Sequence, residues 1–115
     1  MCYSCDMETL ITEDKIQEVA DKIAREFNPD KIILFGSYAW GSPDLDSDVD
    51  LFVIKGTDDT RQLARDISGA IHPRPFALDI LVYRPHVVEE ELQVGDYFVE
   101  DVMNNGKVLY ERATA

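Results

Sequence analysis

Three short apolar runs, each bounded by turn-forming residues, constrain the fold of this chain more than any other feature. They are Lys31–Phe35 (KIILF), Asp48–Ile54 (DVDLFVI) and Phe76–Tyr83 (FALDILVY). Runs of this length that are rich in β-branched and aromatic side chains predict buried strands. Lys107–Tyr110 (KVLY) predicts a short final strand. Strands this apolar cannot be exposed on both faces, so helices must cover the sheet.

Four further segments have the apolar spacing or the end signals of helices. The order of elements is α-β-β-α-β-α-α-β, which predicts one α/β (α+β) domain over residues 1–115. We expect a small mixed β-sheet with helices packed on one side of it, preceded by a frayed N-terminus at residues 1–10. The predicted helices are Thr12–Phe27, Asp58–Ile71, Pro85–Gln93 and Asp96–Met103.

The charge of the chain narrows its function. Among 115 residues, 11 are Lys or Arg and 23 are Asp or Glu, which gives a net charge of −12. A free-standing binder of DNA or RNA needs a basic face that displaces counterions, and an anionic membrane surface likewise attracts basic proteins. We therefore expect no direct nucleic-acid partner and no membrane partner. A metal ion or a basic protein is the natural complement.

The N-terminal segment and the cysteines favour a cytoplasmic protein. No apolar run approaches the roughly 20 residues of a membrane span, and Met1–Leu10 lacks the pattern of a secretory signal. Cys2 and Cys5 form a single C-x-x-C pair, and neither His72 nor His86 has finger-like spacing from it. We expect both thiols to be incidental.

The segment between the first two predicted strands carries the candidate chemistry. Gly36-Ser37 follows a buried strand, where a glycine lets the backbone turn and a helical turn at the serine would form a small anion cradle. Asp48 and Asp50 begin the next strand. Because side chains two residues apart in a strand point to the same face, these carboxylates lie side by side and favour a divalent cation such as Mg²⁺.

Asp79 is a third acid, in the middle of the otherwise apolar run FALDILVY. Considered alone, it would be an edge-strand acid that faces water. If its strand pairs beside the second strand, Asp79 joins Asp48 and Asp50. Three carboxylates around one or two divalent ions, next to a phosphate cradle, form a two-metal site for phosphoryl transfer.

These residues resemble a known family. Gly36-Ser37, ten intervening residues and then Asp48-x-Asp50 are similar to the G-S-x10-D-x-D signature of the DNA polymerase beta-type nucleotidyltransferases. The chain resembles the smallest branch of that superfamily, the minimal nucleotidyltransferases of bacteria and archaea. The resemblance extends from about Ile16 to the ending Gly106–Arg112, and it implies a polymerase beta palm-like fold.

The resemblance also implies a reaction and the role of each residue. Gly36 and Ser37 would bind the β- and γ-phosphates of a nucleoside triphosphate, most simply ATP. Asp48, Asp50 and Asp79 would hold two Mg²⁺ ions, and Asp79 would help to deprotonate the acceptor hydroxyl. Attack on the α-phosphorus would transfer a nucleoside monophosphate and release pyrophosphate.

In this family, the frequent companion is a helical protein of the HEPN type. The transferase is then the antitoxin of a toxin–antitoxin pair, and it can adenylylate a tyrosine of the toxin. The resemblance implies the same partner here. Because 115 residues are used up by the catalytic fold, we expect the acceptor to dock from outside.

One departure from the family pattern leaves two alternatives open. Many relatives carry an arginine two or three positions after the serine, whereas this loop reads Tyr38-Ala39-Trp40-Gly41 and has no cation. Arg61, Arg65 or Arg74 would have to reach the phosphates instead. The alternatives are a catalytically weak or inactive module that neutralises a helical partner by binding, and an aminoglycoside-type transferase that acts on a small molecule.

Overall fold

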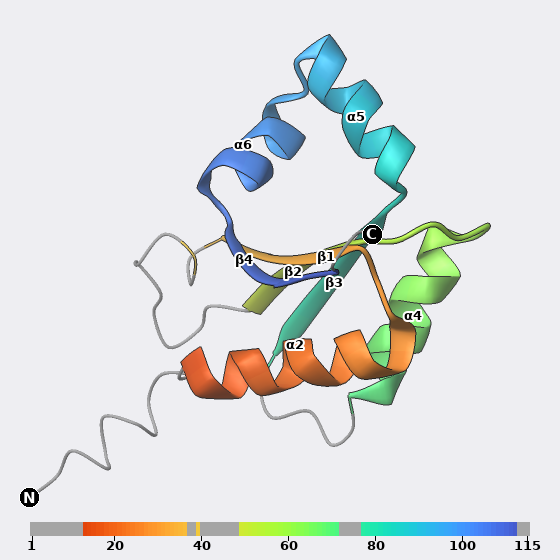
Figure 1. Cartoon of the computed structure of the whole chain (residues 1–115), viewed down its shortest axis with the longest axis vertical. Helices are drawn as coiled ribbons and strands as arrows, with labels where there is room; N and C mark the ends of the chain where they lie inside the picture. The colour runs from red at the N-terminus through yellow and green to blue at the C-terminus, as the bar shows by residue number, and fades with distance from the viewer. Residues whose placement is uncertain (1–12, 37–38, 40–48, 72–76, 113–115) are drawn as a thin grey trace, which may run out of the picture.

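The computed structural model describes residues 13–36, 39, 49–71 and 77–112 of the chain. Within these residues, the predicted order of helices and strands is confirmed (Figure 1). The helices are α2 (Glu13–Phe27), α4 (Thr60–Ala70), α5 (Pro85–Val94) and α6 (Tyr97–Asn105). The strands are β1 (Lys31–Phe35), β2 (Val49–Ile54), β3 (Leu78–Tyr83) and β4 (Lys107–Glu111).

The four strands form one mixed sheet in the order β3-β2-β1-β4. β1 is antiparallel to both β2 and β4, whereas β2 and β3 are parallel. The parallel pair follows from the chain path, because α4 connects β2 to β3 and returns the chain to the same end of the sheet. The prediction of a small mixed sheet is confirmed.

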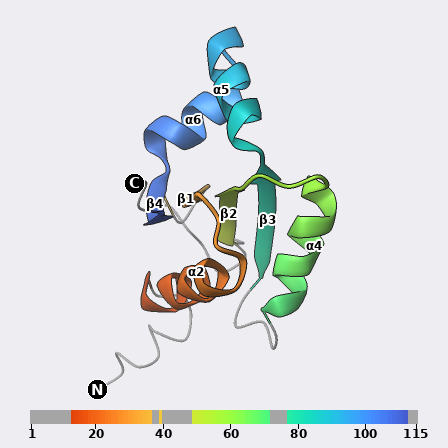
Figure 2. The same cartoon turned by 45° about the vertical axis from the view of Figure 1, so that its right-hand side comes forward.

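The expectation that helices cover one side of the sheet is wrong, because they pack on both faces. Ile23 of α2 and Ile67 of α4 are fully buried in one core with Leu51 of β2. Val99 of α6 is buried in a second core with Phe52 of β2. Figures 1 and 2 show α5 and α6 on the opposite side of the sheet from α2. The side chains of β2 point alternately to the two faces and therefore contribute to two separate cores.

Local signals explain most of the element ends. Helix α2 ends at Phe27, before Asn28 with a left-handed φ of 48° and Pro29. Asp59 caps α4 by accepting a hydrogen bond from the Gln62 amide at 3.0 Å. Helix α6 continues two residues beyond its predicted end at Met103. The expected N-cap of α2, Thr12, lies outside the described residues.

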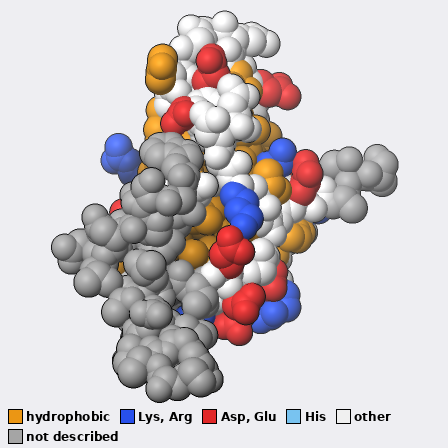
Figure 3. Space-filling view, turned by 90° about the vertical axis from the view of Figure 1, so that its left-hand side faces the viewer, with side chains coloured by type: hydrophobic (Ala, Val, Ile, Leu, Met, Phe, Trp, Pro, Cys, Tyr) orange, Lys and Arg blue, Asp and Glu red, His pale blue; other side chains and the backbone are white. Residues whose placement is uncertain are grey.

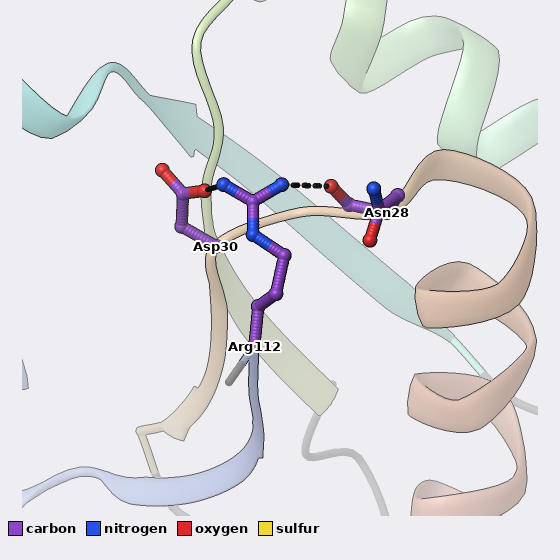
Figure 4. Close-up of polar contacts among 3 residues, drawn as sticks. All are labelled: Asn28, Asp30 and Arg112. Carbon is purple, nitrogen blue, oxygen red and sulfur yellow. Dashed lines mark hydrogen bonds and ion pairs between the residues drawn. The ribbon is translucent and has the colours of Figure 1, made fainter. Parts of the chain in front are cut away.

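The end of β4 is fastened to the start of β1 (Figure 4). The Arg112 amide donates to the Asp30 carbonyl at 2.9 Å, and its guanidinium pairs with the Asp30 carboxylate. The same guanidinium donates to the Asn28 carbonyl at 3.3 Å. Next to it, Lys31 and Glu111 form an ion pair at 3.2 Å. These contacts fix the sheet end that lies farthest from the first residues of β2.

None of the helices in the described part of the chain has the length and the apolar character needed to cross a bilayer.

Candidate functional site

Two of the predicted site carboxylates lie on adjacent strands in register. Asp50 of β2 pairs with Asp79 of β3 across the parallel ladder, and with Phe35 of β1 across the antiparallel ladder. Because in-register partners point to the same face of a sheet, the two carboxylates are neighbours. Phe52, two residues beyond Asp50, packs in the α5–α6 core, so the carboxylates lie on that face. The pairing that the sequence analysis required for Asp79 is confirmed.

Gly36 lies directly against the Asp50 carboxylate. It follows β1 with a φ of 82°, a conformation that side chains rarely adopt. A Cβ added at this position would overlap Oδ2 of Asp50 and lie 3.4 Å from its Cγ. The Gly36 carbonyl accepts a hydrogen bond from the Ala39 amide at 3.0 Å, so the chain turns at this point. Glycine therefore allows this close approach without a shift of the Asp50 side chain.

Ser37 and Asp48 lie outside the described residues. Asp48 immediately precedes Val49, the first residue of β2, and is two positions from Asp50. Within the part of the chain that the structure describes, no group of three His, Cys, Asp or Glu side chains could hold a metal ion. The described part of the site is therefore one glycine and two carboxylates, which supply hard oxygen ligands.

An apolar wall adjoins the carboxylates on the same face, and the sequence analysis did not foresee it as part of a site. Phe98 of α6 packs edge-on against Phe35, with ring centroids 5.5 Å apart, and lies 6.2 Å from Phe52. Leu81 pairs with Phe52 in the sheet and is two residues beyond Asp79 on β3. Leu81 and Phe98 are each 39% exposed. They form an accessible apolar surface beside the acids.

The period of β3 alone could have indicated Leu81, because Asp79, Leu81 and Tyr83 alternate onto one face. No sequence signal could have placed Phe98, because its contacts join α6 to strands more than 40 residues earlier in the chain. Its neighbour Tyr97 is largely exposed.

A carboxyl pair lies where α5 turns into α6. A hydrogen bond to Asp96 raises the pKa of Glu91, with smaller contributions from desolvation and from nearby negative charge. The backbone amide of Val99 lowers the pKa of Asp96, which caps α6 by accepting that hydrogen bond at 2.9 Å. Burial, followed by the charges of Asp96 and Glu91, raises the pKa of Tyr83. This negative charge lies near Tyr83, which pairs with Ile54 at the other end of the β2–β3 ladder from Asp50 and Asp79.

Neither of the two described arginines that were considered for the phosphates lies at this site. Arg61 is in the first turn of α4. That turn follows the Ile54 end of β2, whereas Asp50 is at the other end of the strand. Arg65 is exposed and donates to Gln62 of its own helix at 3.1 Å. Arg74 lies outside the described residues.

Lys107 is a described cation at the same end of the sheet as Gly36. It pairs with Leu34 of β1, and its ammonium group contacts Glu13 of α2 at 3.0 Å. Leu34 belongs to the α2–α4 core, so this ion pair lies on the face of the sheet opposite the carboxylates.

Comparison with known proteins is consistent with this geometry. The family model described as "Polymerase beta, Nucleotidyltransferase" matches residues 15–115. A crystal structure of a Sulfolobus solfataricus protein assigned to the nucleotidyltransferases is similar to this chain, with a TM-score of 0.58 and 18% identity. The similarity covers 86% of this chain and 79% of that one.

A second similar structure is a mutant of the toxin–antitoxin MntA–HpeT. It has a TM-score of 0.50 and 20% identity, over 89% of this chain and 75% of that one. Two aspartates that are separated by a single residue are replaced by glutamate in it. At these identities, both similarities concern the fold. A search of curated proteins gave no match.

Proposed function

Because this chain belongs to the polymerase beta nucleotidyltransferase family, we propose that it transfers a nucleoside monophosphate, from ATP with Mg²⁺, to a hydroxyl group of a partner protein. The observation that carries the proposal is the in-register pair Asp50–Asp79 with Gly36 against the Asp50 carboxylate. We further propose that the partner is a helical toxin of the HEPN type and that this chain is its antitoxin.

The donor set fits a divalent ion. Asp50 and Asp79 present carboxylate oxygens on one face, and Asp48 adds a third when it follows the same strand alternation. These three residues would hold two Mg²⁺ ions. When bound, the ions offset the charge of the triphosphate and favour ionisation of the acceptor hydroxyl. In this proposal, the exposed Asp79 takes the proton from that hydroxyl.

The backbone at Gly36 supports the assignment of the phosphate site. A residue without a side chain lets a ligand approach the main chain closely, and Gly36 is such a residue beside Asp50. Ser37 is the next residue and would add an amide and a hydroxyl. In the reaction, the acceptor oxygen forms a bond to the α-phosphorus. The bond between that phosphorus and the β-phosphate oxygen breaks, and pyrophosphate leaves.

The similarity to MntA–HpeT supports a protein acceptor. That structure is described as a toxin–antitoxin, and its altered aspartates have the spacing of Asp48 and Asp50. The net charge of −12 is compatible with a basic protein partner and disfavours nucleic acid as the acceptor.

Label transfer tests the proposal directly. The chain is incubated with Mg²⁺, ATP labelled at the α-phosphate, and the product of the neighbouring reading frame. We expect label on the partner protein, and a loss of roughly 100-fold or more with Asp50→Asn. Asp66→Asn is the matched control, because Asp66 is an exposed acid on α4. Label transfer that is unchanged by Asp50→Asn would contradict the proposal.

The absence of Lys and Arg from positions 38–41 favours a second candidate, a module that neutralises its partner by binding alone. The same reaction separates the two. Complex formation without label transfer, together with no calorimetric binding of MgATP, would support the binding module. Label on an aminoglycoside instead of the protein would support the small-molecule alternative.

A further inference from the structure

We propose that α5 and α6 form a docking arm for the acceptor protein, and that this acceptor presents Lys and Arg side chains around an apolar strip. This inference rests on the proposed function, which identifies the docked protein as the acceptor. It adds the surface on which the acceptor docks and the chemistry of that surface. The docking arm is residues 85–106, all of which the structure describes.

The docking arm has a one-sided charge. It contains six Asp and Glu residues and no Lys or Arg, so it carries half of the net charge of −12. These acids are Glu89, Glu90, Glu91, Asp96, Glu100 and Asp101. Both helices extend away from the sheet in Figures 1 and 2. The top of the molecule in Figure 3, which they form, shows acidic and hydrophobic side chains. Such a surface attracts a basic protein.

The docking arm also exposes apolar side chains. Among the described residues, five large hydrophobic side chains are exposed, and three of them lie on this arm. Tyr97 is 88% exposed, Val94 is 79% exposed and Phe98 is 39% exposed. Apolar and aromatic side chains within a polar rim are the composition of a protein interface. A surface that attracted a basic protein by charge alone would not need exposed apolar side chains.

The exposed apolar side chains of the arm continue along the surface toward the carboxylates. Phe98 contacts Phe35, and Phe35 is the strand partner of Asp50. Leu81, a fourth exposed hydrophobic residue, lies on β3 two positions beyond Asp79. A protein that covers Tyr97, Phe98 and Leu81 therefore passes beside both acids. The surface can hold an acceptor hydroxyl at the site, which a surface on the α2–α4 face could not do.

Charge decides between the possible occupants. A second copy of this chain carries the same net charge of −12 and the same acidic arm, so pairing two arms is opposed by repulsion. Nucleic acid is repelled for the same reason. A protein with basic side chains around an apolar strip is the complement.

Binding measured without ATP or Mg²⁺ tests the docking arm independently of catalysis. The probe is the product of the neighbouring reading frame, titrated by calorimetry at several salt concentrations. The double variant Glu90→Lys/Glu100→Lys reverses two exposed charges of the arm. The matched control, Glu18→Lys/Asp66→Lys, reverses two exposed acids on α2 and α4. We expect the arm variant to bind at least about tenfold more weakly and with a smaller salt dependence, and the control to change binding less than about twofold.

Tyr97→Ala tests the apolar part, and because this side chain is largely exposed we expect the variant to fold. We expect binding to weaken about tenfold or more. Asp50→Asn should bind like the unaltered chain, so that lost transfer with retained binding separates failure of the chemistry from failure of docking. Equal binding by the arm and control variants would overturn the inference. So would arm-dependent self-association of the chain, measured by sedimentation, or failure of the unaltered chain to bind the probe.

Discussion

The two faces of the sheet differ in what their side chains do. The face under α2 and α4 is apolar, and its buried members include Val49, Leu51 and Val53 of β2. The opposite face of the same strand carries Asp50, followed by Phe52 and Ile54. On that face α5 and α6 leave Leu81 and Phe98 accessible beside the acids.

This difference shows how a short chain can combine stability with a site. Successive residues of a strand point to opposite faces, so β2 contributes to the α2–α4 core and presents a carboxylate with the same six residues. The face under α2 and α4, here called the covered face, can be optimised for burial without altering the acids. The face that carries Asp50 and Asp79, here called the open face, is covered by α5 and α6 only in part and keeps the acids accessible.

Asp79→Asn is expected to have the largest effect of the changes that follow, and it affects function alone. Asp79 is exposed, so the amide should be accommodated without loss of folding stability. We expect label transfer to fall about 100- to 1000-fold, because a carboxylate that helps to hold the metal ions and takes the acceptor proton is lost. The measurement is the initial rate of label transfer at saturating MgATP.

Asp66→Asn controls for the removal of one surface charge. If Asp79→Asn and Asp66→Asn transfer label at the same rate, Asp79 is an edge-strand acid that faces water, and the open face is less specialised than we propose.

Ile23→Ala tests the covered face. Ile23 is fully buried in the α2–α4 core, so the truncation removes apolar contacts and leaves a cavity. We expect the free energy of unfolding to fall by about 3 kcal/mol. Transfer per folded molecule should be unchanged, because Asp50 and Asp79 lie on the opposite face of the sheet from this core. Urea unfolding followed by circular dichroism gives the stability, and the transfer rate is measured well below the unfolding midpoint.

A selective loss of transfer by folded Ile23→Ala would break the comparison between the faces. It would mean that packing under α2 positions the carboxylates on the far side of the sheet.

Gly36→Ala affects the open face through the backbone. Alanine is strained at a φ of 82°, and its Cβ would displace the Asp50 carboxylate. We expect the free energy of unfolding to fall by roughly 1–2 kcal/mol, accompanied by loss of transfer. Gly69→Ala in α4 is the control, since its Cβ would meet nothing within 4 Å and alanine favours the helix. Retained stability and transfer in Gly36→Ala would contradict the close approach.

The strands and the helices could be predicted from periodicity because each signal is local. The stripe of α2, the apolar runs and the stop at Asn28-Pro29 depend only on neighbouring residues. The expected position of Asp79 beside Asp50 is confirmed by the pairing of β3 with β2, whereas its role in a metal site stays a prediction.

The packing of α5 and α6 on the face that carries Asp50 could not be predicted in this way. It depends on contacts such as Phe98 with Phe35 and Val99 with the second core, which join distant segments. The expected cradle at Ser37 and the third acid Asp48 remain predictions, because both lie outside the described residues.

Arg112→Ala is expected to have the smallest effect, and it tests an edge of the sheet that belongs to neither the covered core nor the site. Its ion pair with Asp30 and its hydrogen bond to Asn28 are partly exposed, so solvent screens them. We expect the free energy of unfolding to fall by less than about 1 kcal/mol. Urea unfolding at low and high salt measures this, and the difference from the unaltered chain should shrink as salt rises.

Arg61→Ala removes another exposed arginine, at α4, and controls for the change in net charge. Transfer should be unaffected, because Asp30 and Asp50 lie at opposite ends of the sheet. A loss of transfer in Arg112→Ala with Arg61→Ala unchanged would show that the end of β4 acts on the carboxylates through β1, and the division of roles would then run along the sheet and not between its faces.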